Sequence, residues 1–195
     1  SAALAVACIR ALADATETAL ENHQIVDIAS SAQLACGCSF TGSVDDSWAA
    51  VEPGWKVVDP SRPAAEGVLM QGEVEDLDDW TILILDRGPR VIQPDPERFQ
   101  AAAGQFQQAI SAIEQGHIFN AMIHNGRAVA AALGDNMGRK TCNDMGILGS
   151  RVSTISGSGP AIALIIPSSQ EATVRRVKQT LEPRDWEILQ TTFHT

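Results

Sequence analysis

The alternation of apolar and polar residues predicts a regular series of strands and helices in the second part of the chain. Residues 80–85 are apolar, β-prone and bounded by acids, which predicts a strand. Further strands are predicted over 151–156, 161–166 and 185–193, and helices over 96–115, 118–133, 137–149 and 168–181. This order predicts an α+β fold in which helices cover one face of an antiparallel sheet.

The first part of the chain is predicted to be helical at its start and irregular afterwards. The predicted elements are helices over 1–21 and 24–36, a loop rich in Gly, Ser and Asp over 37–46, a strand or hairpin over 47–59, and an exposed connection over 60–79. The length of the chain allows either one good core or two small lobes that share an interface.

Composition and charge narrow the class of protein. The chain has 195 residues, of which 45% are hydrophobic and 19% charged, as is typical of a globular protein rather than a disordered one. A net charge of -10 argues against nucleic acid as a partner. No stretch approaches the ~20 apolar residues that span a bilayer, and no secretory signal is visible. We therefore expect a cytoplasmic protein without a membrane partner.

The four cysteines have the spacing of neither a disulfide framework nor paired zinc knuckles. Cys36 and Cys38 alternate within an apolar stretch. Since free cysteine packs like a small hydrophobic residue, we expect both to be buried in a reducing compartment.

Three short segments carry candidate chemistry. Ser1-Ala2-Ala3 opens a helix, where free backbone N–H groups and the helix dipole favour a phosphate, although Ser is also a common N-cap. In Thr41-Gly42-Ser43-Val44-Asp45-Asp46, one acid can take a proton from a hydroxyl while the other holds a metal or a substrate; a solvated turn is the alternative. Ser156-Gly157-Ser158-Gly159-Pro160-Ala161 joins two apolar strands and forms either an anion-binding nest or an ordinary turn.

Taken together and in this order, the three segments resemble the motifs of the galactokinase, homoserine kinase and mevalonate kinase superfamily. The start resembles the tail of its Gly-Leu-x-Ser-Ser-Ser-Ala-Ala phosphate loop, TGSVDD resembles the turn at its catalytic Asp, and SGSGPAIAL resembles its third, Gly-rich motif. In detail they resemble most closely the archaeal shikimate kinases. The resemblance covers essentially the whole chain and implies the superfamily fold without its N-terminal strands, with 1–79 as the rest of the phosphate-binding lobe and 80–195 as the C-terminal domain.

The resemblance also implies an activity and roles for individual residues. Such enzymes transfer the γ-phosphoryl group of ATP, with Mg²⁺, to the hydroxyl of a small molecule, here shikimate, giving shikimate 3-phosphate. Asp45 matches the catalytic Asp, and Asp46 is the candidate for substrate or metal contact. Ser1, Ala2 and Ala3 fall at the end of the phosphate loop, and Gly157, Ser158, Gly159 and Pro160 match the motif that supports the phosphates and the substrate.

The chain departs from the family pattern in two ways. The Gly-Leu-x-Ser-Ser core would lie before Ser1, so we interpret the chain as N-terminally truncated and expect it to have little or no kinase activity alone. The acidic metal ligand that mevalonate kinase relatives place before the catalytic Asp has no match, since Leu34 stands near its position. Either Asp46 takes this role or ATP itself holds the metal, so the metal ligands stay open.

The identity of the acceptor is the least constrained part of the hypothesis. Arginine matches a carboxylate with two parallel hydrogen bonds, so a basic residue is expected at the acceptor's acid group. The candidates are Arg87, Arg90, Arg139, Lys140 and Arg151, with Arg151 preferred because it enters the strand before the third motif. The alternatives are another small-molecule kinase of the superfamily, such as a homoserine or pantoate kinase, or an inactive fragment that acts as a binding module.

Overall fold

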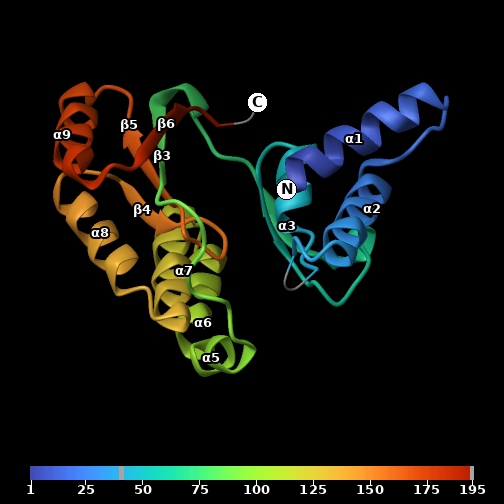
Figure 1. Cartoon of the computed structure of the whole chain (residues 1–195), viewed down its shortest axis with the longest axis horizontal. Helices are drawn as coiled ribbons and strands as arrows, with labels where there is room; N and C mark the ends of the chain where they lie inside the picture. The colour runs from blue at the N-terminus through green and yellow to red at the C-terminus, as the bar shows by residue number, and fades with distance from the viewer. Residues whose placement is uncertain (40–41, 194–195) are drawn as a thin grey trace. The chain divides into compact units, whose positions relative to one another are not determined.

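The computed structural model describes residues 1–39 and 42–193, and it confirms the predicted α+β class with antiparallel sheets. The chain divides into two compact units, an N-terminal unit, Ser1–Glu75, and a C-terminal unit, Asp76–Phe193 (Figure 1). Each unit has its own hydrophobic core, one around Val26 and the other around Leu164.

Helices dominate the N-terminal unit. Its elements are the helices α1 (Ala2–Ala15), α2 (Asn22–Ala35), α3 (Asp45–Val51) and α4 (Ala64–Gly67), and the antiparallel strands β1 (Trp55–Val58) and β2 (Val68–Gly72). The predicted helices at the start are thus confirmed with shorter bounds. Helix α2 begins with a capping box, in which the Glu21 N–H donates to Gln24 Oε1 at 2.9 Å, so its first turn is fixed by its own sequence.

Three predictions for this unit are wrong. Residues 45–51 form a helix, where a loop is predicted up to 46 and a strand or hairpin over 47–59, and only β1 is a strand in that range. The helix forms because Val44, Trp48 and Val51 recur at helical spacing and all three are buried in the core. The predicted exposed connection over 60–79 contains α4 and β2. Cys36 and Cys38 are both exposed, since they follow the last turn of α2 and lie beyond its buried face.

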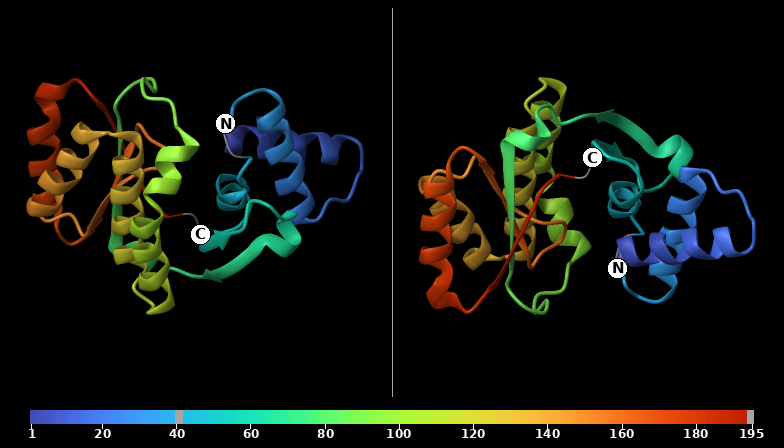
Figure 2. Two further views of the ribbon diagram at one scale, coloured as in Figure 1. Left: turned by 90° about the horizontal axis from the view of Figure 1, so that it is seen from below. Right: turned by 90° about the horizontal axis from the view of Figure 1, so that it is seen from above.

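The C-terminal unit matches its predicted elements closely. Its strands are β3 (Trp80–Asp86), β4 (Val152–Ile155), β5 (Ile162–Pro167) and β6 (Glu187–Thr191), paired antiparallel in the order β4-β5-β3-β6. Its helices are α5 (Pro96–Ala101), α6 (Ala103–Glu114), α7 (Ile118–Leu133), α8 (Asn136–Ile147) and α9 (Glu171–Leu181), with short 3-10 helices at Leu77–Asp79 and Glu182–Arg184. Helices α6 and α7 lie side by side (Figure 2).

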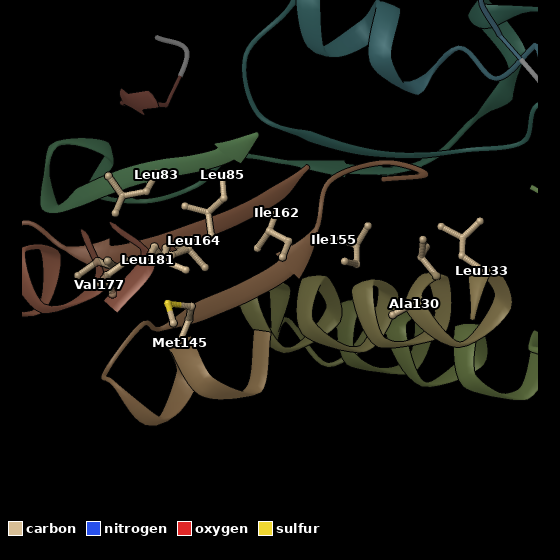
Figure 3. Close-up of a cluster of buried hydrophobic side chains, with 12 residues drawn as sticks. Leu83, Leu85, Ala130, Leu133, Met145, Ile155, Ile162, Leu164, Val177 and Leu181 are labelled. Atoms are coloured by element: carbon tan, nitrogen blue, oxygen red, sulfur yellow. The ribbon is translucent and has the colours of Figure 1, made fainter. Parts of the chain in front are cut away.

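The core of this unit lies between the sheet and its helices. Alternate residues of the central strands, such as Leu83 and Leu164, face Met145 of α8 and Val177 and Leu181 of α9 (Figure 3). Each of these five side chains is at most 1% exposed. Full burial of one such side chain contributes about 1.5–3 kcal/mol, so this layer holds the hairpin of β4 and β5 in place.

Helix α7 approaches β4 unusually closely, at Gly126. A Cβ atom at this position would lie 2.0 Å from Thr154 Oγ1 and 2.8 Å from the backbone N of Ile155. The Thr154 hydroxyl also donates to the backbone oxygen of Met122 at 2.8 Å, which ties the strand to the helix. A residue without a side chain is therefore needed where the two backbones meet.

The first prediction concerns this contact. Gly126→Ala should destabilise the C-terminal unit by about 3 kcal/mol, because the new methyl group must push β4 away from α7. Gly104→Ala is the matched control: it is also a helical glycine, and nothing lies within 4 Å of its Cβ position. It should be neutral or stabilising by up to about 1 kcal/mol. Urea unfolding followed by tryptophan fluorescence measures both, and equal midpoints would contradict the predicted contact.

Candidate functional site

The first turn of α1, in the N-terminal unit, is not capped by a side chain. Ser1 is the N-cap, but its hydroxyl makes no capping bond; the first helical bond runs from the Ala5 N–H to Ser1 O at 3.0 Å. The N–H groups of the first turn therefore have no partner within the helix. With only methyl side chains at Ala2 and Ala3, an anion can approach these groups closely.

The two predicted acids open α3. Asp45 and Asp46 form its first turn and both keep contact with solvent. The protein around the Asp46 carboxylate nevertheless removes part of its water, which raises the pKa of Asp46, and the charge of Asp45 raises it further.

A buried glutamine joins these two helix starts. Gln33 of α2 is 6% exposed; its Oε1 accepts a hydrogen bond from Ser1 Oγ at 2.9 Å, and its Nε2 donates to Ser47 Oγ at 3.2 Å. The same Nε2 lies 3.3 Å from the backbone oxygen of Ala29. Ser47 is fully buried and directly follows the acidic pair. One side chain therefore holds the head of α1 against the start of α3, and we call this set Ser1–Gln33–Ser47 the glutamine bridge.

The loop before α3 is fastened to the same helix. Ser30 of α2 donates to the Gly42 backbone oxygen at 2.6 Å, and the Gly42 N–H donates to Ser39 Oγ at 3.0 Å. Thr41, the first residue of the predicted acidic motif, lies outside the described residues. Sequence reasoning missed both Gln33 and Ser30, whose only signal was a pair of polar residues on the otherwise apolar face of α2.

In the C-terminal unit, the glycine-rich segment forms the turn between β4 and β5. The Ser156 N–H donates to Ala161 O, and the Gly159 N–H donates to Ser156 O, both at 2.9 Å. Gly157 and Gly159 have φ values of 52° and 72°, in the left-handed region that favours glycine. Because the turn uses the Gly159 N–H internally, it offers a ligand fewer donors than the predicted nest.

Two arginines from the segment after β3 hold this turn. Arg90 Nη2 donates to Ser158 Oγ at 2.6 Å and to Gly159 O at 3.1 Å. Arg87 donates to the Pro160 backbone oxygen and forms a nearly buried ion pair with Asp135. The turn is therefore held by both side chains, and the guanidinium of Arg90 places a positive charge beside it.

Asp135 links this ion pair to the helices. It is the N-cap of α8, where its carboxylate accepts the Gly138 N–H at 2.8 Å. Burial alone would raise the pKa of Asp135, but the hydrogen bonds from Arg87 and Gly138 and the charge of Arg87 hold this pKa below its usual value. The carboxylate consequently remains charged and fixes the guanidinium of Arg87.

A cavity of about 300 Å³ lies beside the turn, within the C-terminal unit. Its lining includes Arg90, Val91, Ile92, Met137, Ser158 and Pro160. The mixture of an exposed guanidinium, a hydroxyl and apolar side chains suits a small organic acid. Neither Arg139 nor Lys140 is among the residues that line this cavity.

Arg151, the preferred basic residue in the sequence, is not brought to the turn. It precedes β4, whereas the turn follows β4, so the two are separated by about 17 Å of extended chain. Its guanidinium lies over the Phe119 ring, 5.7 Å from the ring centroid. Among the predicted basic residues, Arg87 and Arg90 are those that contact the turn.

The first turn of α1 and the acidic pair, which the glutamine bridge joins, have the chemistry to hold ATP and its metal ion. The helix N-terminus suits phosphate oxygens, and adjacent carboxylates are the oxygen ligands that Mg²⁺ prefers. Among the residues that the structure describes, His, Cys, Asp and Glu side chains do not gather in groups of three or more that could hold a metal. Over the same residues, every helix is too short or too polar to cross a lipid bilayer.

Comparisons with known proteins agree with the motifs. No protein-family model matches the chain. A shikimate kinase from Methanothermobacter thermautotrophicus is 26% identical over 165 residues, which cover 84% of this chain and 54% of the relative.

Solved structures show the same fold. Homoserine kinase from Cytophaga hutchinsonii aligns with a TM-score of 0.61 and 17% identity over 100% of this chain and 64% of its own. L. major mevalonate kinase, solved with R-mevalonate, aligns with a TM-score of 0.64 and 13% identity over 99% of this chain and 64% of its own. The chain spans about half of the shikimate kinase and less than two thirds of these two kinases. It has the fold of these homoserine and mevalonate kinases, as the resemblance of the motifs implies.

The second prediction tests the ion pair that anchors the turn. Asp135→Asn should destabilise the C-terminal unit by about 3 kcal/mol at neutral pH, because it leaves Arg87 without its counter-charge in a nearly buried place. A carboxyl group with a lowered folded-state pKa stabilises the fold above its unfolded pKa of about 3.9 and loses this contribution as the pH falls through the folded value. The variant should therefore lose less stability than the wild type between neutral and acid pH.

The matched control is Glu171→Gln, which removes the exposed ion pair with Arg175 on α9. Surface pairs of this kind contribute about 0–1 kcal/mol, so little change is expected. Urea unfolding at a series of pH values measures all three proteins. An Asp135→Asn curve parallel to that of the wild type would show that the ion pair does not supply the acid-sensitive stability.

Proposed function

We propose that the protein to which this chain belongs phosphorylates shikimate with ATP, giving shikimate 3-phosphate. The observation that carries the proposal is the glutamine bridge, which joins an open helix N-terminus to two adjacent carboxylates in one unit. The relative from Methanothermobacter, a shikimate kinase, supports the choice of acceptor. Phosphoryl transfer depends mainly on positioning and charge neutralisation, and both are what this arrangement can provide.

The head of α1 is proposed to bind phosphate oxygens of ATP. The N–H groups of its first turn donate to the oxygens, and the helix dipole adds partial positive charge. Ala2 and Ala3 keep the approach open, whereas a longer side chain would stand in front of these donors. This role compensates for the net charge of -10, which otherwise repels an anionic nucleotide.

The acidic pair is proposed to serve the acceptor and the metal. Asp45 orients the acceptor hydroxyl and accepts its proton as the new oxygen–phosphorus bond forms. Burial and the charge of Asp45 raise the pKa of Asp46, because both disfavour its ionised form. A bound cation would offset this cost, and Asp46 is therefore the candidate contact for Mg²⁺. When bound with ATP, Mg²⁺ would neutralise part of the charge on the phosphoryl oxygens.

Arg90 is proposed to bind the carboxylate of a small organic acid in the cavity of the C-terminal unit. Its guanidinium is exposed, lines the cavity and is oriented by Ser158 and the Gly159 carbonyl. Arg87 is less suited, because Asp135 already neutralises it. In this proposal Gly157, Ser158, Gly159 and Pro160 position the arginines rather than binding the phosphates directly.

Another small-molecule kinase is the second candidate. The fold is shared with homoserine and mevalonate kinases, and fold alone does not choose the acceptor. Homoserine and pantoate also carry a hydroxyl group on which Asp45 can act in the same way. A binding module without catalysis is the remaining alternative.

The third prediction decides among these functions. The full-length protein should release ADP from Mg-ATP when shikimate is added, and much more slowly with homoserine, mevalonate or pantoate. Asp45→Asn should lower kcat by about 10²–10⁴-fold, because it removes the proton acceptor while leaving the nucleotide site intact. Asp14→Asn, an exposed acid near the end of α1, is the matched control and should keep full activity.

The coupled ADP-release assay distinguishes a shikimate kinase from a kinase for another acceptor and from a binding module. ADP release that depends on another alcohol would replace shikimate with that acceptor. Nucleotide binding without release for any acceptor would favour the binding module. Full activity of Asp45→Asn would remove Asp45 from its proposed role.

A further inference from the structure

The end of α2 exposes two thiols, Cys36 and Cys38, separated only by Gly37. Cysteine is one of the most frequently buried residue types, so a pair of exposed thiols this close together is unusual. A Cβ atom placed on Gly37 would have nothing within 4 Å, and Gly37 has a φ of 70°. The backbone between the two cysteines is therefore both sharply turned and free of side-chain packing.

The two thiols belong to one turn at the end of α2. The Cys36 thiol donates to the Gln33 backbone oxygen, with a sulfur–oxygen distance of 3.6 Å. The two thiols also interact with each other, because the side chain of Cys36 is the main cause that raises the pKa of Cys38. The Cys38 and Ser39 N–H groups donate to the same Gln33 oxygen at 2.8 and 3.1 Å. The thiol pair is thus built onto the residue that forms the glutamine bridge.

We propose that Cys36 and Cys38 form a reversible thiol–disulfide site, and that its oxidation weakens the glutamine bridge. The partner is a low-molecular-weight disulfide, for which oxidised glutathione serves as the probe. The second half of this proposal rests on the proposed function, because the bridge is assigned to the phosphoryl-transfer site. The first half stands on the thiol geometry alone.

The chemistry is two successive thiol–disulfide exchanges. The thiolate of one cysteine attacks the oxidant's S–S bond, forming a mixed disulfide and releasing one small thiolate, which takes up a proton. The second cysteine, as its thiolate, then attacks the cysteine sulfur of the mixed disulfide and displaces the second small thiol. Two protein thiols lose two electrons and two protons, and the oxidant's disulfide gains them as two thiols.

Oxidation would act on Gln33 through its backbone. Forming the disulfide removes the Cys36 S–H, so its bond to the Gln33 oxygen is lost. A disulfide also demands a Cβ–Cβ separation near 3.8 Å and a dihedral near 90°, which resets the turn whose N–H groups hold that oxygen. The Gln33 side chain that contacts Ser1 and Ser47 is therefore displaced from its position.

The fourth prediction tests the thiol site in the full-length protein. Equilibration with increasing ratios of oxidised to reduced glutathione, acid quenching and peptide mass spectrometry should show a Cys36–Cys38 disulfide that a dithiol reductant reverses. Cys142 is the internal reference: it is partly buried and burial raises its pKa to about 11, so it should react less with thiol reagents than the exposed pair, in which the pKa of Cys38 is raised mainly by its interaction with Cys36. Alkylation of both Cys36 and Cys38 at every ratio would overturn the proposal.

Two cysteine variants test whether the disulfide joins Cys36 to Cys38. Cys38→Ser should leave only a mixed disulfide with glutathione at Cys36, because the resolving thiol is gone. Cys8→Ser, which removes an exposed thiol on α1, should still form the Cys36–Cys38 disulfide. A mixed disulfide as the end product in the wild type would mean that the pair does not close, and it would also overturn the proposal.

Coupling to the bridge is measured separately, by hydrogen exchange and by turnover. Oxidation should speed amide exchange at Cys38, Ser39 and the first turn of α1, and should lower ADP release about tenfold, reversibly. Disulfide formation with unchanged exchange and unchanged turnover would overturn the coupling. Faster exchange in a protein that shows no turnover even when reduced would support the coupling and contradict the proposed function instead.

Discussion

The candidate site in the N-terminal unit depends on one buried amide. Gln33 accepts a hydrogen bond from Ser1 Oγ and donates to Ser47 Oγ, and through these bonds two helix starts from distant parts of the sequence become neighbours. A buried amide that lost a partner would cost about 1–3 kcal/mol, so the three groups support one another. This constraint gives the free N–H groups of α1 and the carboxylates of α3 a fixed relation, which phosphoryl transfer requires.

In the C-terminal unit, charged side chains rather than a buried amide fix the position of the turn beside the cavity. The Arg87–Asp135 ion pair and the Arg90 contacts hold the turn between β4 and β5, while Gly126 allows α7 to come close to the same hairpin. Because α8 begins at Asp135, the turn, the ion pair and the helix form one connected arrangement. The cavity beside the turn therefore has rigid walls on the side where Arg90 presents its charge.

Much of the C-terminal unit was predictable from the sequence, because its strands are uniformly apolar and its helices have clear periodicity. The prediction failed at 45–51, where a helix of seven residues follows a loop and its apolar positions also fit a short strand. It failed again at Cys36 and Cys38, since apolar composition does not reveal where a helix leaves its buried face. The contacts of Gln33 and Arg90 were beyond sequence reasoning because their partners lie 14 to 69 residues away.

The glutamine bridge is the central claim, and the isosteric variant Gln33→Met in the full-length protein tests it most directly. Methionine fills the same space but can neither accept from Ser1 nor donate to Ser47. With the melting temperature and circular dichroism showing a folded protein, the turnover number with shikimate should fall about 100-fold, since the acceptor and the phosphates lose their alignment. A folded Gln33→Met protein with the turnover number of the wild type would contradict the account.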